Sequence, residues 1–127
     1  MSKLAPGVRI LVVEDDYYVA ESTVVLLELE GFDVRSVASG YEALALIADF
    51  KPQVMLLDIG LKGMDGFETA KRLRALPEGR DIYLVAITGY GDAKTRTSAL
   101  EAGCDHFLSK PMGWSELSQL LAEAPLK

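Results

Sequence analysis

The strongest constraint on the fold of this chain of 127 residues is a set of three almost uninterrupted apolar runs. The stretches between these runs are long enough to form helices. The runs span residues 8–13, 54–57 and 82–87. Strands of a parallel sheet that is covered by helices on both faces are apolar along nearly their whole length, because neither face meets water. The three runs therefore predict the central strands of an α/β fold.

Two further strand-like segments, 32–37 and 105–109, are less apolar. The first alternates apolar with polar residues, and the second is short and mixed, as in strands that have one exposed side. With these two segments as edges, the simplest arrangement is a doubly wound, flavodoxin-like (βα)5 fold whose five parallel strands run in the order 2-1-3-4-5. The topological switch point, where such folds bind ligands, then lies between the first and third strands.

Composition narrows the class of protein. Length and hydrophobic content fit a single domain over 8–124, with short loose tails at 1–7 and 125–127. No apolar run approaches the roughly 20 residues of a membrane span, and the first residues lack a secretory signal, so we expect no membrane partner and a cytoplasmic location. A net charge of −6 without a basic run argues against direct binding of nucleic acid. The lone cysteine, Cys104, is expected to be an ordinary buried or half-buried thiol.

Capping residues predict where three helices begin. Ser39 and Asp65 each stand three residues before a glutamate, which is the spacing of a capping box. The second and third helices should therefore start near Gly40 and Gly66. Asp16 is expected to cap the first helix.

The fourth helix, expected over about 92–102, should be the most weakly anchored. Its predicted inner face carries mostly small residues, which bury little area at roughly 25 cal/mol per Å². The residues expected to face inward are Ala93, Thr97, Ala99 and Leu100. In the fifth helix, an apolar stripe that begins at Trp114 indicates core packing.

Polar residues stand where the predicted strands end. Glu14 and Asp15 follow the first strand, Asp58 the third, Thr88 the fourth and Lys110 the fifth. In a parallel sheet the carboxyl ends of the strands meet at one edge, so three carboxylates, one hydroxyl and one ammonium group should converge there.

Such a group of charges predicts a specific chemistry. Two carboxylates about 4 Å apart repel by about 4 kcal/mol at an effective dielectric near 20, so the cluster favours a hard divalent cation such as Mg²⁺, or a bound proton. Mg²⁺ shares its ligand positions with phosphate oxygens, and an ammonium and a hydroxyl can bind the remaining phosphoryl oxygens. Asp58 ends its strand alone and is the best candidate for a nucleophile that forms an acyl phosphate.

Four stretches carry a family resemblance. They are VRILVVEDD at 8–16, LLDIGLKGMDG at 56–66, AITG at 86–89 and AGCDHFLSKP at 102–111. In this order and at these separations they resemble the receiver domain of two-component response regulators, of the single-domain or hybrid-kinase-attached type. The resemblance covers almost the whole chain.

The resemblance implies that Asp58 accepts a phosphoryl group from the phosphohistidine of a histidine kinase or a histidine phosphotransfer protein. Asp15, Asp58 and the backbone carbonyl of Gly60 would bind Mg²⁺ directly, and Glu14 would act through water. Lys110 would pair with Asp58 and the phosphoryl oxygens. The family also implies a cis bond between Lys110 and Pro111.

The resemblance also implies an output step. Thr88 would move to hydrogen-bond the phosphoryl group, and the aromatic ring of Phe107 would turn into the space that Thr88 leaves. This change would alter the surface of the fourth helix, fifth strand and fifth helix, and so control an unknown downstream protein. The domain would act as a monomer or a phosphorylation-dependent homodimer.

Three positions depart from the commonest family pattern. Glu14 replaces a more usual aspartate, Phe107 lacks the hydroxyl of the usual tyrosine, and Lys62 stands where proline is frequent. The single histidine, His106, is expected to face solvent on an edge strand.

Two other functions compete with the switch. One is a phosphate-independent, receiver-shaped scaffold that binds a protein partner. The other is a magnesium-dependent phosphatase, but haloacid-dehalogenase-type enzymes place two aspartates two residues apart after the first strand, and the segment 13–16 does not offer that pattern. The start at Met1 and the short tails favour a free-standing regulator over a domain cut from a longer protein.

Overall fold

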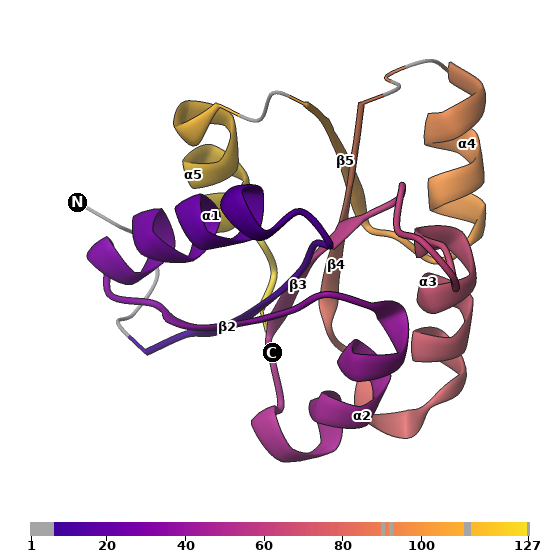
Figure 1. The fold of residues 1–127 in the computed structure, drawn as a ribbon, viewed down its shortest axis with the longest axis horizontal. Coiled ribbons are helices and arrows are strands. Elements are labelled where there is room, and N and C mark those ends of the chain that lie inside the picture. Colours follow the sequence, from indigo (N-terminus) through magenta and orange to yellow (C-terminus); the bar gives the residue numbers. More distant parts are fainter. Residues whose placement is uncertain (1–6, 90, 92, 111–112, 127) are drawn as a thin grey trace.

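A computed structural model describes residues 7–89, 91, 93–110 and 113–126, and it shows a parallel sheet with helices on both faces (Figure 1). The five strands run in the order β2-β1-β3-β4-β5. The predicted flavodoxin-like order is therefore confirmed, with the second and fifth strands at the edges.

The elements alternate strictly along the chain. The strands are β1 (Arg9–Val13), β2 (Asp33–Val37), β3 (Val54–Asp58), β4 (Tyr83–Thr88) and β5 (His106–Ser109). The helices are α1 (Tyr17–Leu29), α2 (Gly40–Phe50), α3 (Gly66–Ala75), α4 (Ala93–Glu101) and α5 (Trp114–Glu123), with one short 3₁₀ helix, η1 (Pro77–Gly79). Each strand lies within one residue of its predicted range at either end.

Burial follows the predicted division between central and edge strands. All of β3 is buried, and so are β1 and β4 except at their first residues. On the edge strand β2, Val34 is buried while its neighbours Asp33 and Arg35 are exposed. His106 begins the other edge strand and is exposed, as expected.

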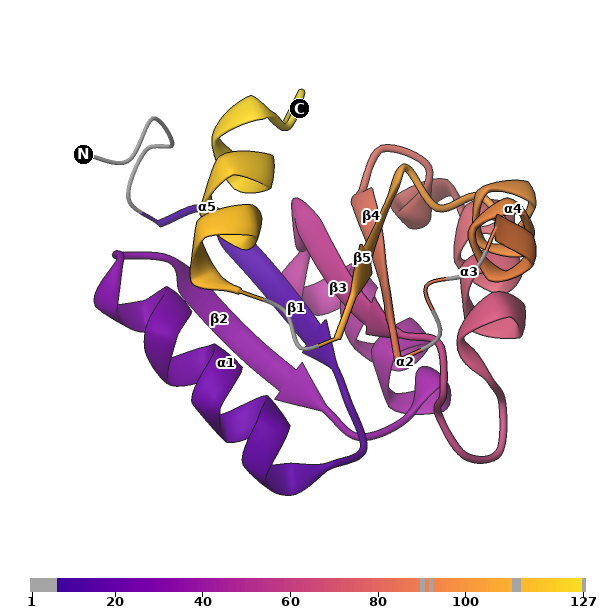
Figure 2. The same ribbon diagram turned by 90° about the horizontal axis from the view of Figure 1, so that it is seen from above.

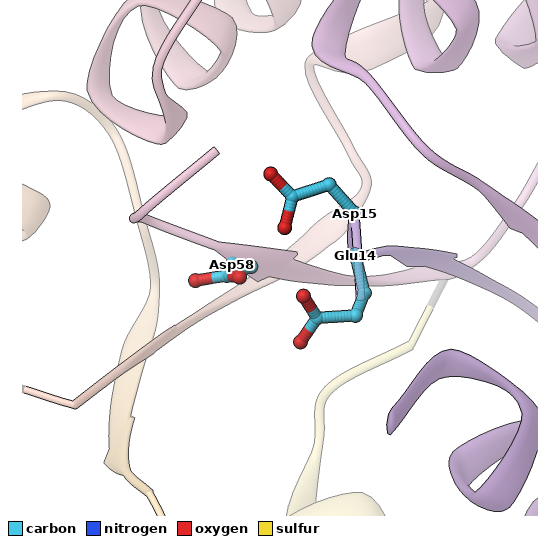
Figure 3. A group of neighbouring side chains, drawn as sticks. All are labelled: Glu14, Asp15 and Asp58. Carbon is cyan, nitrogen blue, oxygen red and sulfur yellow. The ribbon is translucent and has the colours of Figure 1, made fainter. Parts of the chain in front are cut away.

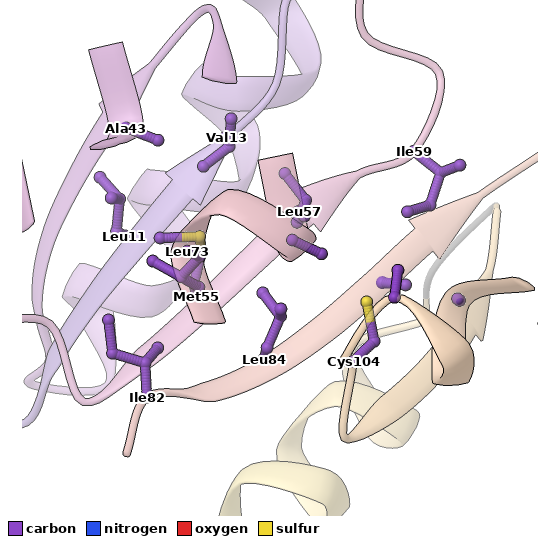
Figure 4. Packing of buried hydrophobic residues seen from close by; sticks show 14 of the residues in the cluster. Leu11, Val13, Ala43, Met55, Leu57, Ile59, Leu73, Ile82, Leu84 and Cys104 are labelled. Carbon is purple, nitrogen blue, oxygen red and sulfur yellow. The ribbon is translucent and has the colours of Figure 1, made fainter. Parts of the chain in front are cut away.

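Two hydrophobic cores lie on opposite faces of the sheet. Figure 2 shows α1 and α5 on one side and α2, α3 and α4 on the other. Alternate residues of each strand enter the two cores, as the period of a strand requires. The α1/α5-side core includes Ile10, Val12, Leu27, Val54, Leu56, Val85, Ile87, Leu108, Leu117, Leu120 and Leu121. The α4-side core includes Leu11, Val13, Ala43, Ile47, Met55, Leu57, Leu73, Leu84, Ala86, Ala99, Cys104 and Phe107, many of them drawn in Figure 4.

The predicted helix starts are confirmed, and side chains cap them. The carboxylate of Asp16 accepts hydrogen bonds from the backbone N–H groups of Tyr18 and Val19. Ser39 and Asp65 likewise accept from the N–H groups three residues ahead. These bonds satisfy amides that the first turn of a helix leaves without partners.

The inner face of α4 was predicted incompletely. Of the four residues expected to face inward, only Ala99 is buried; Ala93 and Thr97 are exposed, and Leu100 is 50% exposed. The helix turns its Ala99 side to the sheet, and Ala102 just beyond its end is also buried. Leu100 lies about 100° further around the helix axis than Ala99, which places it outside that face. Ala99 is the one buried side chain that α4 contributes, as weak anchoring predicts.

Among the described residues, no helix is long and apolar enough to cross a membrane. The predicted cis bond before Pro111 lies outside the described residues.

Candidate functional site

The structure brings the predicted acidic residues together at the carboxyl edge of the sheet. Glu14 and Asp15 directly follow β1, and Asp58 is the last residue of the neighbouring β3. Carboxylate oxygens of all three lie within 4.8 Å of one another, and Figure 3 shows them turned toward a common space. Glu14 is 7% exposed and Asp58 6%, whereas Asp15 is more open. The acidic cluster therefore lies at the predicted switch point between β1 and β3.

Backbone amides hold each carboxylate in position. The N–H of Gly60 donates to Oδ1 of Asp58 at 2.9 Å. The N–H of Lys62, in the same loop, donates to Oδ2 of Asp15 at 3.2 Å. The loop after β3 therefore orients a carboxylate from each of the two strands.

Lys110 joins two of the carboxylates. Its ammonium Nζ lies 3.2 Å from Oε1 of Glu14 and 3.2 Å from Oδ2 of Asp58. The backbone of Lys110 is also fixed, since its N–H donates to the carbonyl of Thr88 at 2.7 Å. The predicted convergence of a lysine with the acidic cluster is thus observed.

The pKa values reflect this crowding. Burial, together with the nearby Asp58 carboxylate, raises the pKa of Glu14 above its ordinary value. Burial alone would lower the pKa of Lys110, but the attraction of Asp58 and Glu14 outweighs it, so the pKa of Lys110 is raised. At neutral pH the ammonium is charged and offsets part of the negative charge of the cluster.

Asp58 and Thr88 end adjacent strands but belong to opposite faces of the sheet. Asp58 pairs with Ile87, the residue before Thr88. By strand alternation, Asp58 shares its face with Leu56 of the α1/α5-side core, and Thr88 shares its face with Ala86 of the α4-side core. Thr88 is 3% exposed. Its hydroxyl group therefore lies at the boundary between the acidic cluster and the α4 side of the molecule.

A hollow of about 650 Å³ opens beside the acidic cluster, between α1 and α5. Glu14, Asp58 and Lys110 form its polar end. Its apolar walls come from β1, β3, β4, α1 and α5, and they include Val12, Leu26, Leu56, Ile87, Trp114 and Leu117. This hollow could not be predicted from the sequence, because its walls come from residues far apart in the chain.

Phe107, the other predicted switch residue, lies away from the hollow. It is on β5, in the α4-side core, and is 7% exposed. Its ring is already buried under α4 in this structure.

Gly66, which was predicted only as the start of a helix, also supports the site. A Cβ atom at this position would lie 2.6 Å from Cα of Ile59 and 2.8 Å from the carbonyl oxygen of Asp58. A larger residue would therefore push the start of α3 against the backbone that carries Asp58. The contact joins residues eight positions apart, and nothing in the local sequence indicates it.

The donor set fits a hard divalent cation. Three carboxylates offer oxygen ligands within reach of one ion, and two of them are buried, where uncompensated negative charge is most costly. Lys110 supplies only one positive charge to this group. A Mg²⁺ ion would suit the remaining charge and the oxygen ligands.

Comparisons with known proteins agree with this geometry. A family model described as response regulator receiver domain matches residues 10–122. The response regulator MprA of Mycobacterium sp. (strain KMS) is 38% identical over 110 residues, which make up 87% of this chain but 47% of that protein. The chain thus spans about half the length of the curated relatives it matches.

Solved structures show the same fold. A CheY-like response regulator receiver domain protein from Methanospirillum hungatei JF-1 has a TM-score of 0.83 and 32% identity, over 94% of this chain and 93% of that one. The receiver domain of the sensor histidine kinase PA1611 from Pseudomonas aeruginosa PAO1 has a TM-score of 0.84 and 30% identity, over 91% of this chain and 94% of that one. The latter was solved with a magnesium ion coordinated in its active site cleft.

Proposed function

Because the chain belongs to the family of response regulator receiver domains, we propose that it is a signalling switch that accepts a phosphoryl group from a phosphohistidine onto Asp58. The observation that supports this most directly is the convergence of three carboxylates on one point, with Lys110 bridging Glu14 and Asp58. A carboxylate that is buried, oriented and paired with an ammonium is well placed to act as a nucleophile toward phosphorus.

In the proposed reaction, a carboxylate oxygen of Asp58 forms a bond to phosphorus while the bond from phosphorus to the imidazole nitrogen of the donor breaks. The attacking group in this reaction is a carboxylate, so the step moves no proton from Asp58. The N–H of Gly60 holds Oδ1 of Asp58, and Lys110 neutralises charge on the transferred oxygens. Asp15, Asp58 and the carbonyl of Gly60 would hold Mg²⁺, with Glu14 acting through water. When bound, the ion would supply Lewis-acid stabilisation of the phosphoryl oxygens.

Thr88 would report the phosphoryl group to the other face of the sheet. It ends the strand next to Asp58 and belongs by alternation to the α4 side. A hydrogen bond from its hydroxyl to a phosphoryl oxygen would change the packing around Phe107. The resulting surface of α4, β5 and α5 would control a downstream protein.

The proposed donor is a histidine kinase or a histidine phosphotransfer protein in the cytoplasm. Helix α1 begins two residues after Asp15 and leaves Tyr18, Val25 and Leu29 largely open to solvent. This apolar face beside the acidic cluster suits a protein donor. We propose that the domain does not contact nucleic acid or membrane directly. We also propose that it acts as a monomer or as a phosphorylation-dependent homodimer.

Phosphoryl uptake tests the assignment. We would incubate the protein with Mg²⁺ and acetyl phosphate and follow its intact mass, with and without a chelator. The native chain should gain one phosphoryl group only when Mg²⁺ is present, and Asp58→Asn should gain none. Asp16→Asn is the matched control, because asparagine caps a helix as well as aspartate does and the substitution removes a neighbouring carboxylate.

Other outcomes would redirect the assignment. Uptake that persists in Asp58→Asn would rule out Asp58 as the acceptor. No uptake under any condition would favour the phosphate-independent scaffold. Steady release of phosphate from small phosphoesters would favour a phosphatase.

A further inference from the structure

We propose that Arg96 is a positioning residue of the output face, whose guanidinium group rests on the ring of Phe107 and holds α4 against β5 in the unphosphorylated protein. The proposal that phosphorylation releases this contact depends on the proposed function. The proposal that the contact holds α4 in the resting protein does not depend on it.

The contact joins a cation on α4 to a buried ring. Cζ of Arg96 lies 5.5 Å from the centroid of the Phe107 ring, within the range of cation–π attraction. Phe107 is 7% exposed, so the guanidinium covers a ring that the core already holds in place. A flexible surface side chain is thus tied to a fixed point.

Within the part of the chain that the structure describes, no ion pair holds Arg96 in another position. Among the described residues, the ion pairs join Arg72 to Glu68, Arg74 to Asp105, and Lys110 to two carboxylates. None of them includes Arg96. Within these residues, the ring of Phe107 is the contact seen for the guanidinium.

The contact matters because the buried side chain of α4 lies away from the beginning of the helix. Ala99 is its one buried side chain and lies in the second half of the helix. Beyond its end, the carbonyl of Gly103 accepts a hydrogen bond from Nε of Arg74 at 2.9 Å, and the N–H of Cys104 donates to the carbonyl of Ala99 at 3.0 Å. Helix α4 is thus fixed at its C-terminal end, while Arg96 ties down its first turn.

The ring also lies where a change at Thr88 can reach it. Phe107 pairs with Ala86 across the β4–β5 ladder, and Ala86 and Thr88 face the same side of β4. If Thr88 moves toward a phosphoryl group on Asp58, the ring gains room beside Ala86 and moves away from Arg96. The first turn of α4 then loses this contact, and the output surface changes.

Hydrogen exchange of the α4 amides tests the resting role. In the unphosphorylated protein, Arg96→Gln should exchange about two- to fivefold faster than the native chain, as expected for the loss of an exposed cation–π contact. Arg96→Lys keeps a cation and should show a smaller change. The matched control is Lys94→Gln, which removes the same charge from an exposed position of the same helix and should leave exchange unchanged.

Equal exchange in Arg96→Gln and the native chain would overturn the proposal. An equal increase in Lys94→Gln would also overturn it, because the effect would then come from helix charge and not from the ring. Phe107→Leu provides a second route: with the ring absent, Arg96→Gln should have no further effect on α4.

The release step is tested after treatment with acetyl phosphate and Mg²⁺, with uptake confirmed by intact mass. Native and Arg96→Gln proteins should then exchange equally fast in α4, because phosphorylation has already broken the contact. A difference that persists would show that the contact takes no part in the switch. If no phosphoryl group is taken up, the proposed function fails, but the comparison in the resting protein still decides whether Arg96 positions α4.

Discussion

At the scale of single residues, the acidic cluster is crowded with negative charge. The carboxylate oxygens of this cluster lie within 4.8 Å of one another, and at that outer limit two charges repel by about 3 kcal/mol at an effective dielectric of 20 and by about 1 kcal/mol in water. Lys110 offsets this repulsion only for Glu14 and Asp58. Asp15 keeps its place through the N–H of Lys62, so its charge can be removed without disturbing the lysine.

We therefore expect Asp15→Asn to make the metal-free protein slightly more stable, by up to about 1 kcal/mol, because it removes like-charge repulsion while the amide oxygen still accepts from Lys62. The same variant should lose the stabilisation that Mg²⁺ gives the native chain, because one ligand is missing. Urea unfolding with a chelator and with Mg²⁺ measures both effects. A Mg²⁺ response in Asp15→Asn as large as that of the native chain would contradict the assigned ligand set.

Cys104 gives a second prediction at this scale. Burial raises the pKa of its thiol to about 11, although the nearby Arg74 acts in the opposite direction. At pH 8 a thiol reagent should therefore react at least a hundredfold more slowly with the native protein than with the unfolded chain. In the unfolded chain the thiol has its ordinary pKa of 9.0, so it loses its proton at a lower pH than the folded thiol does. The contribution of Cys104 to the free energy of unfolding should therefore be complete below pH 9 and should fall between pH 9 and about 11. Rapid labelling of the folded protein at pH 8 would show that Cys104 is open to solvent.

At the scale of elements, Arg74 connects segments that the sequence does not relate. Nη1 of Arg74, at the end of α3, donates to the carbonyl oxygens of Gly79, Arg80 and Ile82. The other guanidinium nitrogens donate to the carbonyl of Gly103 and to Oδ2 of Asp105. One side chain thus joins the end of α3 to the beginning of β4 and to the loop before β5.

Replacing Arg74 by Met should lower the free energy of unfolding by about 2–4 kcal/mol, because several partly buried carbonyl groups lose their donor. Arg72→Met is a matched control on the same helix. Arg72 forms an exposed ion pair with Glu68, so its loss should cost no more than about 0.5 kcal/mol. Urea unfolding measures both values. Equal losses in the two variants would show that the carbonyl contacts contribute little.

Elements with a strong local pattern could be predicted from the sequence. The central strands follow from apolar runs, and the starts of α2 and α3 follow from Ser39 and Asp65. The inner face of α4 could not be predicted from the sequence, because small residues occur on several sides of that helix. Only its packing decides which side is buried. The Arg74 contacts could not be predicted either, since an arginine in the last turn of a helix usually has a simpler explanation.

At the scale of the whole molecule, the strand order places α1 and α5 on the face of the sheet to which Asp58 belongs. The outer side of α1 is unusually apolar for a surface helix. Tyr18 is 80% exposed, Val25 46% and Leu29 79%. A protein donor that approaches Asp58 from this side would bury these side chains.

We predict that Leu29→Ser slows phosphoryl transfer from a histidine kinase that phosphorylates the native chain, by about tenfold if the side chain becomes buried in the complex. Uptake from acetyl phosphate should not change, because the small donor does not contact α1. Leu100→Ser is the matched control, since Leu100 is half exposed on the opposite side of the sheet. If Leu29→Ser slows both donors equally, the residue acts on the acceptor site and not on docking.

The position of the site could be predicted at this scale because parallel strands end at one edge. The residues Glu14, Asp15, Asp58 and Lys110 met there as expected. The hollow between α1 and α5 could not be predicted, because its shape depends on how far apart two helices settle.

The sheet itself separates two sets of side chains that can vary independently in evolution. The α1 side chains that would contact a donor lie on one face, and Thr88, Phe107 and α4, which would begin the response, lie on the other, with Asp58 and Thr88 ending adjacent strands between them. Of the proposed output surface, α5 shares the face of α1. Among the described residues, no side chain belongs to both cores. A lineage could therefore change the donor that it recognises without altering its response, and the reverse, so that gene duplication could yield insulated pathways through substitutions on one face alone.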